Sequence, residues 1–91
     1  MVAALSAMPA YARPHHGEAW ARERFAAAER MREALNGRPP AERSRRDYQR
    51  VLNAYRSVYY GAPTSTKADP SAVAVAETLV EMGRRLKTTK S

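Results

Sequence analysis

The chain has 91 residues, no cysteine, a formal net charge of +7 and a pI of about 10.4. This length allows one small domain at most, and the lack of cysteine excludes disulfides, thiolate metal sites and cysteine nucleophiles. The positive charge favours acidic partners, namely nucleic acid, anionic lipid or an anionic wall polymer, without selecting among them.

The N-terminal stretch 1–12 is uncharged and ends in Ala10-Tyr11-Ala12. Small residues at the −3 and −1 positions are what a signal peptidase accepts, although a basic region and a longer apolar run are missing. We interpret 1–12 as the remnant of a signal peptide and 13–16 as a linker, which predicts an exported protein of the periplasm or cell envelope. The alternative is a disordered, alanine-rich N-terminus. The stretch is too short to span a bilayer, which takes about 20 apolar residues.

The first helix is expected from Gly17 or Glu18 to Leu35, because glutamates lie early in it and Asn36-Gly37 supplies a C-terminal stop. Its apolar residues recur at helical spacing on one face. We expect Trp20 to anchor this helix to the other two. The stripe contains Trp20, Ala27, Met31 and Leu35.

The second helix is expected from about Ala41 to Tyr60, after a break at Pro39-Pro40, since proline lacks a backbone donor and restricts the residue before it. Gly61 is the expected residue just beyond its C-terminus. The apolar stripe of this helix is the clearest periodic signal in the chain, with the spacing i, i+3, i+4, i+7, i+10, i+11. It comprises Tyr48, Val51, Leu52, Tyr55, Val58 and Tyr59.

A short connection over residues 61–68 leads to a third helix, which is expected to begin at Asp69-Pro70. Aspartate accepts hydrogen bonds from first-turn N–H groups, and proline at the first helical position has no N–H to satisfy. Residues 88–91 have no apolar side chain, so we expect a disordered tail there, after a helical domain over 17–87. The apolar face of the third helix carries Ala72, Val75, Ala76, Leu79, Gly83 and Leu86, widened by Val73, Val80 and Met82.

No strand pattern is present, so the sequence predicts an all-α fold of three helices. Two amphipathic helices joined by a short loop are the unit of TPR-type repeats, which stack on further copies. We therefore expect a TPR-like helical hairpin with a preceding helix, as an incomplete repeat array whose third helix exposes Val73, Val80 or Met82. The predicted core is Trp20, Met31, Leu35, Tyr48, Val51, Leu52, Tyr55, Val58, Tyr59, Val75, Ala76, Leu79 and Leu86.

Residues 54–69, AYRSVYYGAPTSTKAD, resemble the A-F-x-x-V-x-x-x-Y-P-x-S-x-x-A junction of exported TPR-like proteins, including the outer-membrane-assembly lipoproteins. Residues 28–86 resemble the helical segment that precedes the catalytic domain in some bacterial N-acetylmuramoyl-L-alanine amidases. The matching stretches are AERMR (28–32), RRDY (45–48), VLNAY (51–55), VAE (75–77) and EMG (81–83). The resemblance implies an N-terminal, non-catalytic piece, because the zinc ligands and base of that family match nothing in this chain.

Two basic clusters are candidate interaction surfaces. Arg45, Arg46 and Arg50 fit either a phosphate or nucleic-acid contact or a solvated helix face with ordinary ion pairs from Glu42 and Asp47. The second interpretation is favoured at the sequence level. The cations near the end of the third helix complement its dipole, and docking on an anionic wall is the alternative. With the off-stripe Tyr60, the candidate surface is Arg45, Arg46, Arg50, Tyr60, Arg84 and Arg85.

No catalytic, cofactor-binding or metal-binding residues are predicted. Adjacent histidines such as His15-His16 point in different directions on an extended chain and cannot easily bind the same metal ion. Glu77 and Glu81, one helical turn apart, are interpreted as part of a solvent-exposed face. The sequence therefore predicts a non-catalytic scaffold segment of a cell-envelope protein. Its expected partner is an adjacent repeat or a downstream domain, with an anionic cell-wall polymer as a further candidate. The alternative function is a small basic nucleic-acid binder, although nucleic acid is the less favoured partner.

Overall fold

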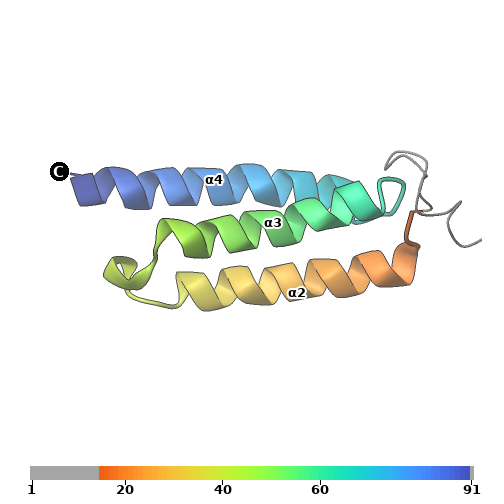
Figure 1. The fold of residues 1–91 in the computed structure, drawn as a ribbon, viewed down its shortest axis with the longest axis horizontal. Coiled ribbons are helices and arrows are strands. Elements are labelled where there is room, and N and C mark those ends of the chain that lie inside the picture. The colour runs from red at the N-terminus through yellow and green to blue at the C-terminus, as the bar shows by residue number, and fades with distance from the viewer. Residues whose placement is uncertain (1–14, 91) are drawn as a thin grey trace, which may run out of the picture.

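The computed structural model describes residues 15–90, with side chains as far as Lys87. This part of the chain forms three long helices and one short 3-10 turn without any strand, so the all-α prediction is confirmed. Figure 1 shows the three helices side by side and alternating in direction. The expected signal-peptide remnant 1–12 lies outside the described residues. The elements are α2 (Glu18–Asn36), η2 (Pro40–Glu42), α3 (Arg45–Gly61) and α4 (Ala68–Lys90).

The observed α2 agrees with the expected first helix to within one residue at each end. Gly17 caps it without a side-chain hydrogen bond. The Glu18 carboxylate accepts hydrogen bonds from the hydroxyl of Thr66 and, at 2.9 Å, from its backbone N–H, and these hold the pKa of Glu18 below its ordinary value. The start of α2 is thereby tied to the loop between α3 and α4. At the other end, the Gly37 N–H donates to Glu33 O at 3.0 Å.

The second helix begins at Arg45, four residues later than expected at Ala41. The proline pair starts only the 3-10 turn η2, and Arg43 then has an extended backbone with φ −102° and ψ 106°. Ser44 and Asp47 form a capping box: the Asp47 N–H donates to Ser44 Oγ and the Ser44 N–H donates to Asp47 Oδ2, both at 3.1 Å. The box satisfies two free backbone donors and sets the start of α3.

The third helix begins at Ala68, so Asp69 lies in its first turn and does not precede it. The Ser71 N–H donates to Lys67 O at 3.0 Å. Pro70 therefore falls among the first residues of the helix, whose N–H groups have no intrahelical partner in any case. The backbone continues as helix to Lys90, into the stretch 88–91 for which the sequence predicts a disordered tail.

The core lies along α3, which packs against both α2 and α4 while these two touch each other little. The ring of Phe25 on α2 meets the ring of Tyr55 at 5.9 Å between centroids. Leu35 of α2 and Val75 of α4 complete this core from either side. The expected α3 stripe is buried at Tyr48, Val51, Leu52, Tyr55 and Val58, and half-buried at Tyr59.

The face that α4 turns to the core differs from the expected one. Leu79 is 41% exposed and Ala76 is exposed, although the sequence places both in the core. Tyr48 and Tyr55 are buried in one core cluster with Ala74 and Val75 of α4, and large rings in a core leave room for small side chains beside them. The helix is rotated accordingly, and its buried residues are Ala68, Ser71, Ala74, Val75 and Thr78, with Met82 and Leu86 half-buried.

On α2 the buried residues lie seven apart, at Ala21, Ala28 and Leu35, and the first two are small. Met31 is 38% exposed, contrary to the expectation that it lies in the core. Alanine permits a close approach of α2 to α3, whereas the longer methionine at this helix position lies toward the solvent. The expected stripe on α2 is thus correct at Leu35 and displaced at Met31.

Trp20 anchors the start of α2 to the end of α3, as expected for this residue. Its indole lies against Gly61, which is the last residue of α3 and does not follow the helix as the sequence predicts. His16 stacks on the indole at 3.9 Å between ring centroids, and its backbone N–H donates to Gly61 O at 2.7 Å. The His15-His16 pair is exposed, but His16 has a defined structural contact.

Candidate functional site

A network of ion pairs and hydrogen bonds joins α2 and α4. Arg32 donates to Glu81 at 2.5 Å and to Glu77 at 3.2 Å, and Asn36 donates to Glu81 at 3.3 Å. The hydrogen bond to Glu81 raises the pKa of Arg32. The two glutamates, which the sequence places on a solvated face, are therefore the partners that hold α4 to α2. Sequence analysis missed Arg32, because its partners are 45 and 49 residues away.

Acid should weaken this network when it protonates Glu81. Burial by itself would raise the pKa of Glu81, but hydrogen bonds from Arg32 and Asn36 and the charges of Arg32 and Arg43 outweigh it, so the pKa lies below 4.5. A carboxylate whose pKa is lower in the folded state stabilises the fold above its unfolded pKa, and this stabilisation is lost as the pH falls through the folded value.

We therefore expect the urea concentration at the midpoint of unfolding to be independent of pH near neutrality and to decrease from about pH 5 downward. Glu81→Gln should have a lower midpoint at neutral pH and a shallower acid decline. The conservative control is Glu33→Gln, at an exposed position for which the described residues show no ion pair. An acid decline of equal steepness in wild type and Glu81→Gln would contradict the role given to Glu81.

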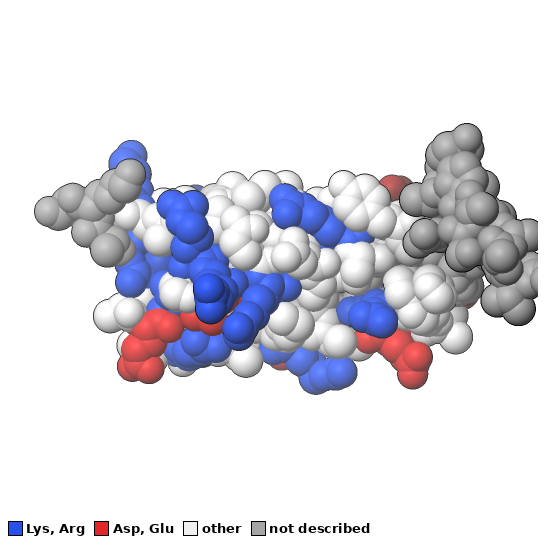
Figure 2. All heavy atoms as spheres, viewed as in Figure 1, with Lys and Arg blue, Asp and Glu red and all other residues white. Residues whose placement is uncertain are grey.

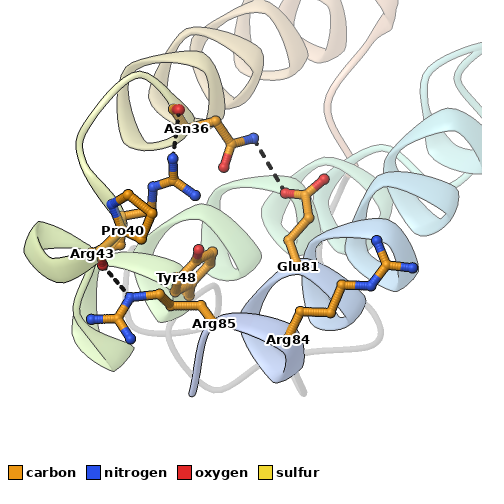
Figure 3. A pocket seen from close by; sticks show the side chains of 7 residues that line it. All are labelled: Asn36, Pro40, Arg43, Tyr48, Glu81, Arg84 and Arg85. Carbon is orange, nitrogen blue, oxygen red and sulfur yellow. Dashed lines mark hydrogen bonds between the residues drawn. The ribbon is translucent and has the colours of Figure 1, made fainter. Parts of the chain in front are cut away.

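A surface pocket of about 460 Å³ opens where α2 ends, α3 begins and α4 ends. Arg43 donates to the backbone oxygens of Asn36 and Arg38, both at 2.9 Å, and Arg85 donates to the Pro40 oxygen. The arginines thus hold the connection between α2 and α3 against the end of α4. Figure 3 shows Tyr48 in the middle of the lining side chains. The lining consists of Asn36, Pro40, Arg43, Tyr48, Glu81, Arg84 and Arg85.

Three guanidinium groups and one carboxylate line this pocket, so it carries excess positive charge. On the face drawn in Figure 2, the Lys and Arg side chains gather toward this end of the bundle. Arg85, expected on an interaction surface, fastens α4 to the Pro40 carbonyl, and Arg84 lines the same pocket. Arg85 therefore has a partner outside α4, in addition to the favourable interaction with the dipole of α4 that the sequence predicts for this cluster.

The outer face of α3 holds the other expected arginines. Arg45, Arg46 and Arg50 are exposed, and none of them makes a hydrogen bond or ion pair with the described residues. The ion pairs expected from Glu42 and Asp47 are not formed. Glu42 belongs to the separate turn η2, and the Asp47 carboxylate accepts from Ser44 and, at 3.1 Å, from Arg38.

Three more polar residues share this outer face and were not singled out in the sequence: Gln49, Asn53 and Arg56. Their spacing of three or four residues from one another and from the expected arginines is the signal that identifies them. Tyr60 extends the same face and is 71% exposed, with its ring at 4.9 Å from that of Tyr59 in an edge-on contact. The face therefore combines guanidinium, amide and phenol groups without a carboxylate.

The outer face of α4 is apolar. Val73 is 57% exposed and Val80 is 52% exposed, as expected for an incomplete repeat, whereas Met82 packs against the core. The exposed small and aliphatic residues follow the spacing i, i+1, i+4, i+7, i+8, i+11, which is one continuous stripe on a helix. We call this the α4 stripe, and it comprises Ala72, Val73, Ala76, Leu79, Val80 and Gly83.

The described residues contain no group of His, Asp and Glu side chains that could hold a metal ion. No helix in residues 15–90 combines the length and the hydropathy that crossing a membrane requires. The features that remain are therefore surfaces: the α4 stripe, the outer face of α3 and the cationic pocket. Comparison with family models, curated proteins and solved structures finds no match to this chain.

Proposed function

We propose that this chain is a non-catalytic helical interaction module that docks a partner helix on the α4 stripe. The observation that carries the proposal is that α4 is apolar on two neighbouring sides, while its third side carries Glu77, Glu81 and Arg84. One side packs on α3 through residues such as Val75, and the other presents Val73 and Val80 to solvent. A contiguous exposed apolar stripe commonly marks an interaction site, and internal helices of repeat arrays are covered in this way by the next unit.

The partner that fits the α4 stripe is an amphipathic helix with its own apolar face, either an adjacent repeat or part of a downstream domain. The stripe contains Ala76 and Gly83, whose small size permits close approach of another helix. The resemblance to exported TPR-like segments supports a cell-envelope setting, as part of a peptidoglycan-processing protein. The docking role of α4 does not depend on that setting.

Removing the apolar character of the stripe should abolish association. We expect the chain to self-associate weakly through this uncovered face, so that its average mass in sedimentation equilibrium rises with concentration. Val73→Lys with Val80→Lys should remain monomeric, because two charges cannot be desolvated in a helix–helix contact.

The matched control is Ala19→Lys with Ala34→Lys, two exposed positions on α2. It should associate as the wild type does. Circular dichroism should show equal helicity for all three proteins. A wild-type chain that remains a compact monomer at every concentration and does not enhance the fluorescence of a hydrophobic dye would contradict the proposal.

A further inference from the structure

We propose that the outer face of α3 binds duplex DNA, with the helix lying in the major groove and its arginines on the phosphates. This inference concerns a surface and a partner different from those of the α4 stripe, and it replaces the cell-envelope setting of the proposed function with one in which the chain meets DNA. The first observation is the charge of the face. Arg45, Arg46, Arg50 and Arg56 make no hydrogen bond or ion pair with the described residues.

The acidic residues do not neutralise this face. Asp47 is the only carboxylate within α3, and it is half-buried and engaged by Ser44 and Arg38. Hydrogen bonds from the Ser44 backbone and hydroxyl, with the charge of Arg38, hold the pKa of Asp47 below its ordinary value, so it stays committed to those partners at neutral pH. Four arginines over three turns of one helix, of which Arg56 is half-buried and the others are exposed, thus have no counter-charge among the described residues.

The second observation is how these residues are distributed around the helix axis. With about 100° between successive residues, Asn53 marks the middle of the outer face. Arg50 lies about 60° to one side of it, and Arg56 lies about 60° to the other, with Arg45 about 20° beyond Arg56. Cations therefore flank the face on both sides. Between the flanks lie Arg46, Gln49, Asn53 and Tyr60.

This distribution matches a groove with phosphates on both walls. The major groove is about 12 Å wide and admits one α-helix, whose diameter with side chains is about 10–12 Å. Arg45 and Arg56 are about 17 Å apart along the axis, which corresponds to about five base pairs. In this position the flanking arginines reach the phosphates of the two DNA strands. The side-chain amides of Gln49 and Asn53 face the base edges, where such groups form hydrogen bonds with adenine.

A flexible single-chain polyanion, such as a wall polymer, needs only one row of cations to bind it. Binding of such a polymer does not explain the amides at the centre of the face or the arginines on both flanks. An anionic membrane would be expected to meet apolar side chains beside the cations. Tyr60 is the single large apolar side chain exposed on α3. The arrangement therefore favours a duplex over both of these partners.

The test is fluorescence anisotropy of the full chain with a short labelled DNA duplex over a series of salt concentrations. Each phosphate contact contributes about 0.9 to the slope of log K against log salt, so four arginines predict a slope of about −3 to −4. Arg46→Gln with Arg50→Gln should weaken binding at least about tenfold at low salt and reduce the slope by about 2. Asn53→Ala should keep the slope and reduce the discrimination between duplex sequences.

The control is Arg22→Gln with Arg30→Gln, which removes the same charge from exposed positions on α2. It should retain nearly the wild-type slope, and circular dichroism should show equal helicity in all variants. An equal loss of binding in this control would overturn the proposal, since net charge alone would then explain it. Equal affinity for poly(glycerol phosphate) or phosphatidylglycerol vesicles, or no duplex binding at low salt, would overturn it as well.

Discussion

Tyr55→Ala is expected to destabilise the fold by about 3–5 kcal/mol, the usual cost of emptying a large buried aromatic site. Tyr55 is fully buried at the centre of α3, against Phe25 of α2 and the core shared with α4. A domain of this size has a free energy of unfolding of only about 4–11 kcal/mol. The variant should therefore show partial or complete loss of helicity at room temperature, measured by circular dichroism with urea unfolding.

Tyr55→Phe measures the contribution of the aromatic ring to stability separately from that of the hydroxyl. The hydroxyl is buried without a hydrogen bond of normal geometry, although Arg32 and Glu29 lie near it, and burial raises its pKa, so it stays protonated. Removing a buried group that makes no hydrogen bond relieves its desolvation cost. We expect Tyr55→Phe to be neutral or stabilising by up to about 1 kcal/mol. A destabilisation as large as that of Tyr55→Ala would show that the hydroxyl, and not ring packing, is what the core requires.

Gly61→Ala is expected to destabilise the protein by about 1–3 kcal/mol, although alanine is the better helix former. A Cβ atom at Gly61 would lie 2.7 Å from Trp20 Cζ3 and closer still to Cη2. The indole would have to leave the end of α3, and its stacking with His16 would be disturbed. The backbone of Gly61 does not have a positive φ, so close approach of Trp20 is the reason for glycine at this position.

Gly83→Ala is the matched comparison. A Cβ atom there meets nothing within 4 Å, and the position lies inside α4 on its exposed side. Alanine in a helix interior is favoured over glycine by about 0.5–1 kcal/mol, so this variant should be more stable than the wild type. Thermal unfolding of both variants measures the difference. If Gly61→Ala gains stability as Gly83→Ala does, the Trp20 contact does not constrain the end of α3.

The two exposed faces have different physical origins. The α4 stripe is exposed because the core side of α4 is already occupied by the small residues opposite Tyr48 and Tyr55. The cationic face of α3 has no counter-charge within its own helix, because Asp47, the only carboxylate of α3, is held in the capping box and by Arg38. Both surfaces therefore follow from how the three helices share their contacts.

Several features depend only on local sequence and were predictable. The helix period of residues 48–59 identified the buried side of α3, since one amphipathic stripe is visible without knowledge of its neighbours. The limits of α2 followed from an early glutamate and Asn36-Gly37. The start of α3 carried a local signal too, in Ser44 with Asp47 three residues later, but Pro39-Pro40 suggested an earlier start and this pattern was not used.

Other features required the tertiary structure. The sequence of α4 offers two apolar sides, and only packing into the core that contains Tyr48 and Tyr55 decides that Val75 is buried and Leu79 exposed. Likewise, only packing brings Arg32 of α2 next to Glu81 of α4. The ion pair expected between Asp47 and Arg50 does not form, because the Asp47 carboxylate accepts hydrogen bonds from Ser44 and Arg38. Periodicity states which residues share a face of a helix, but the volume and charge of the facing helices determine which face turns inward.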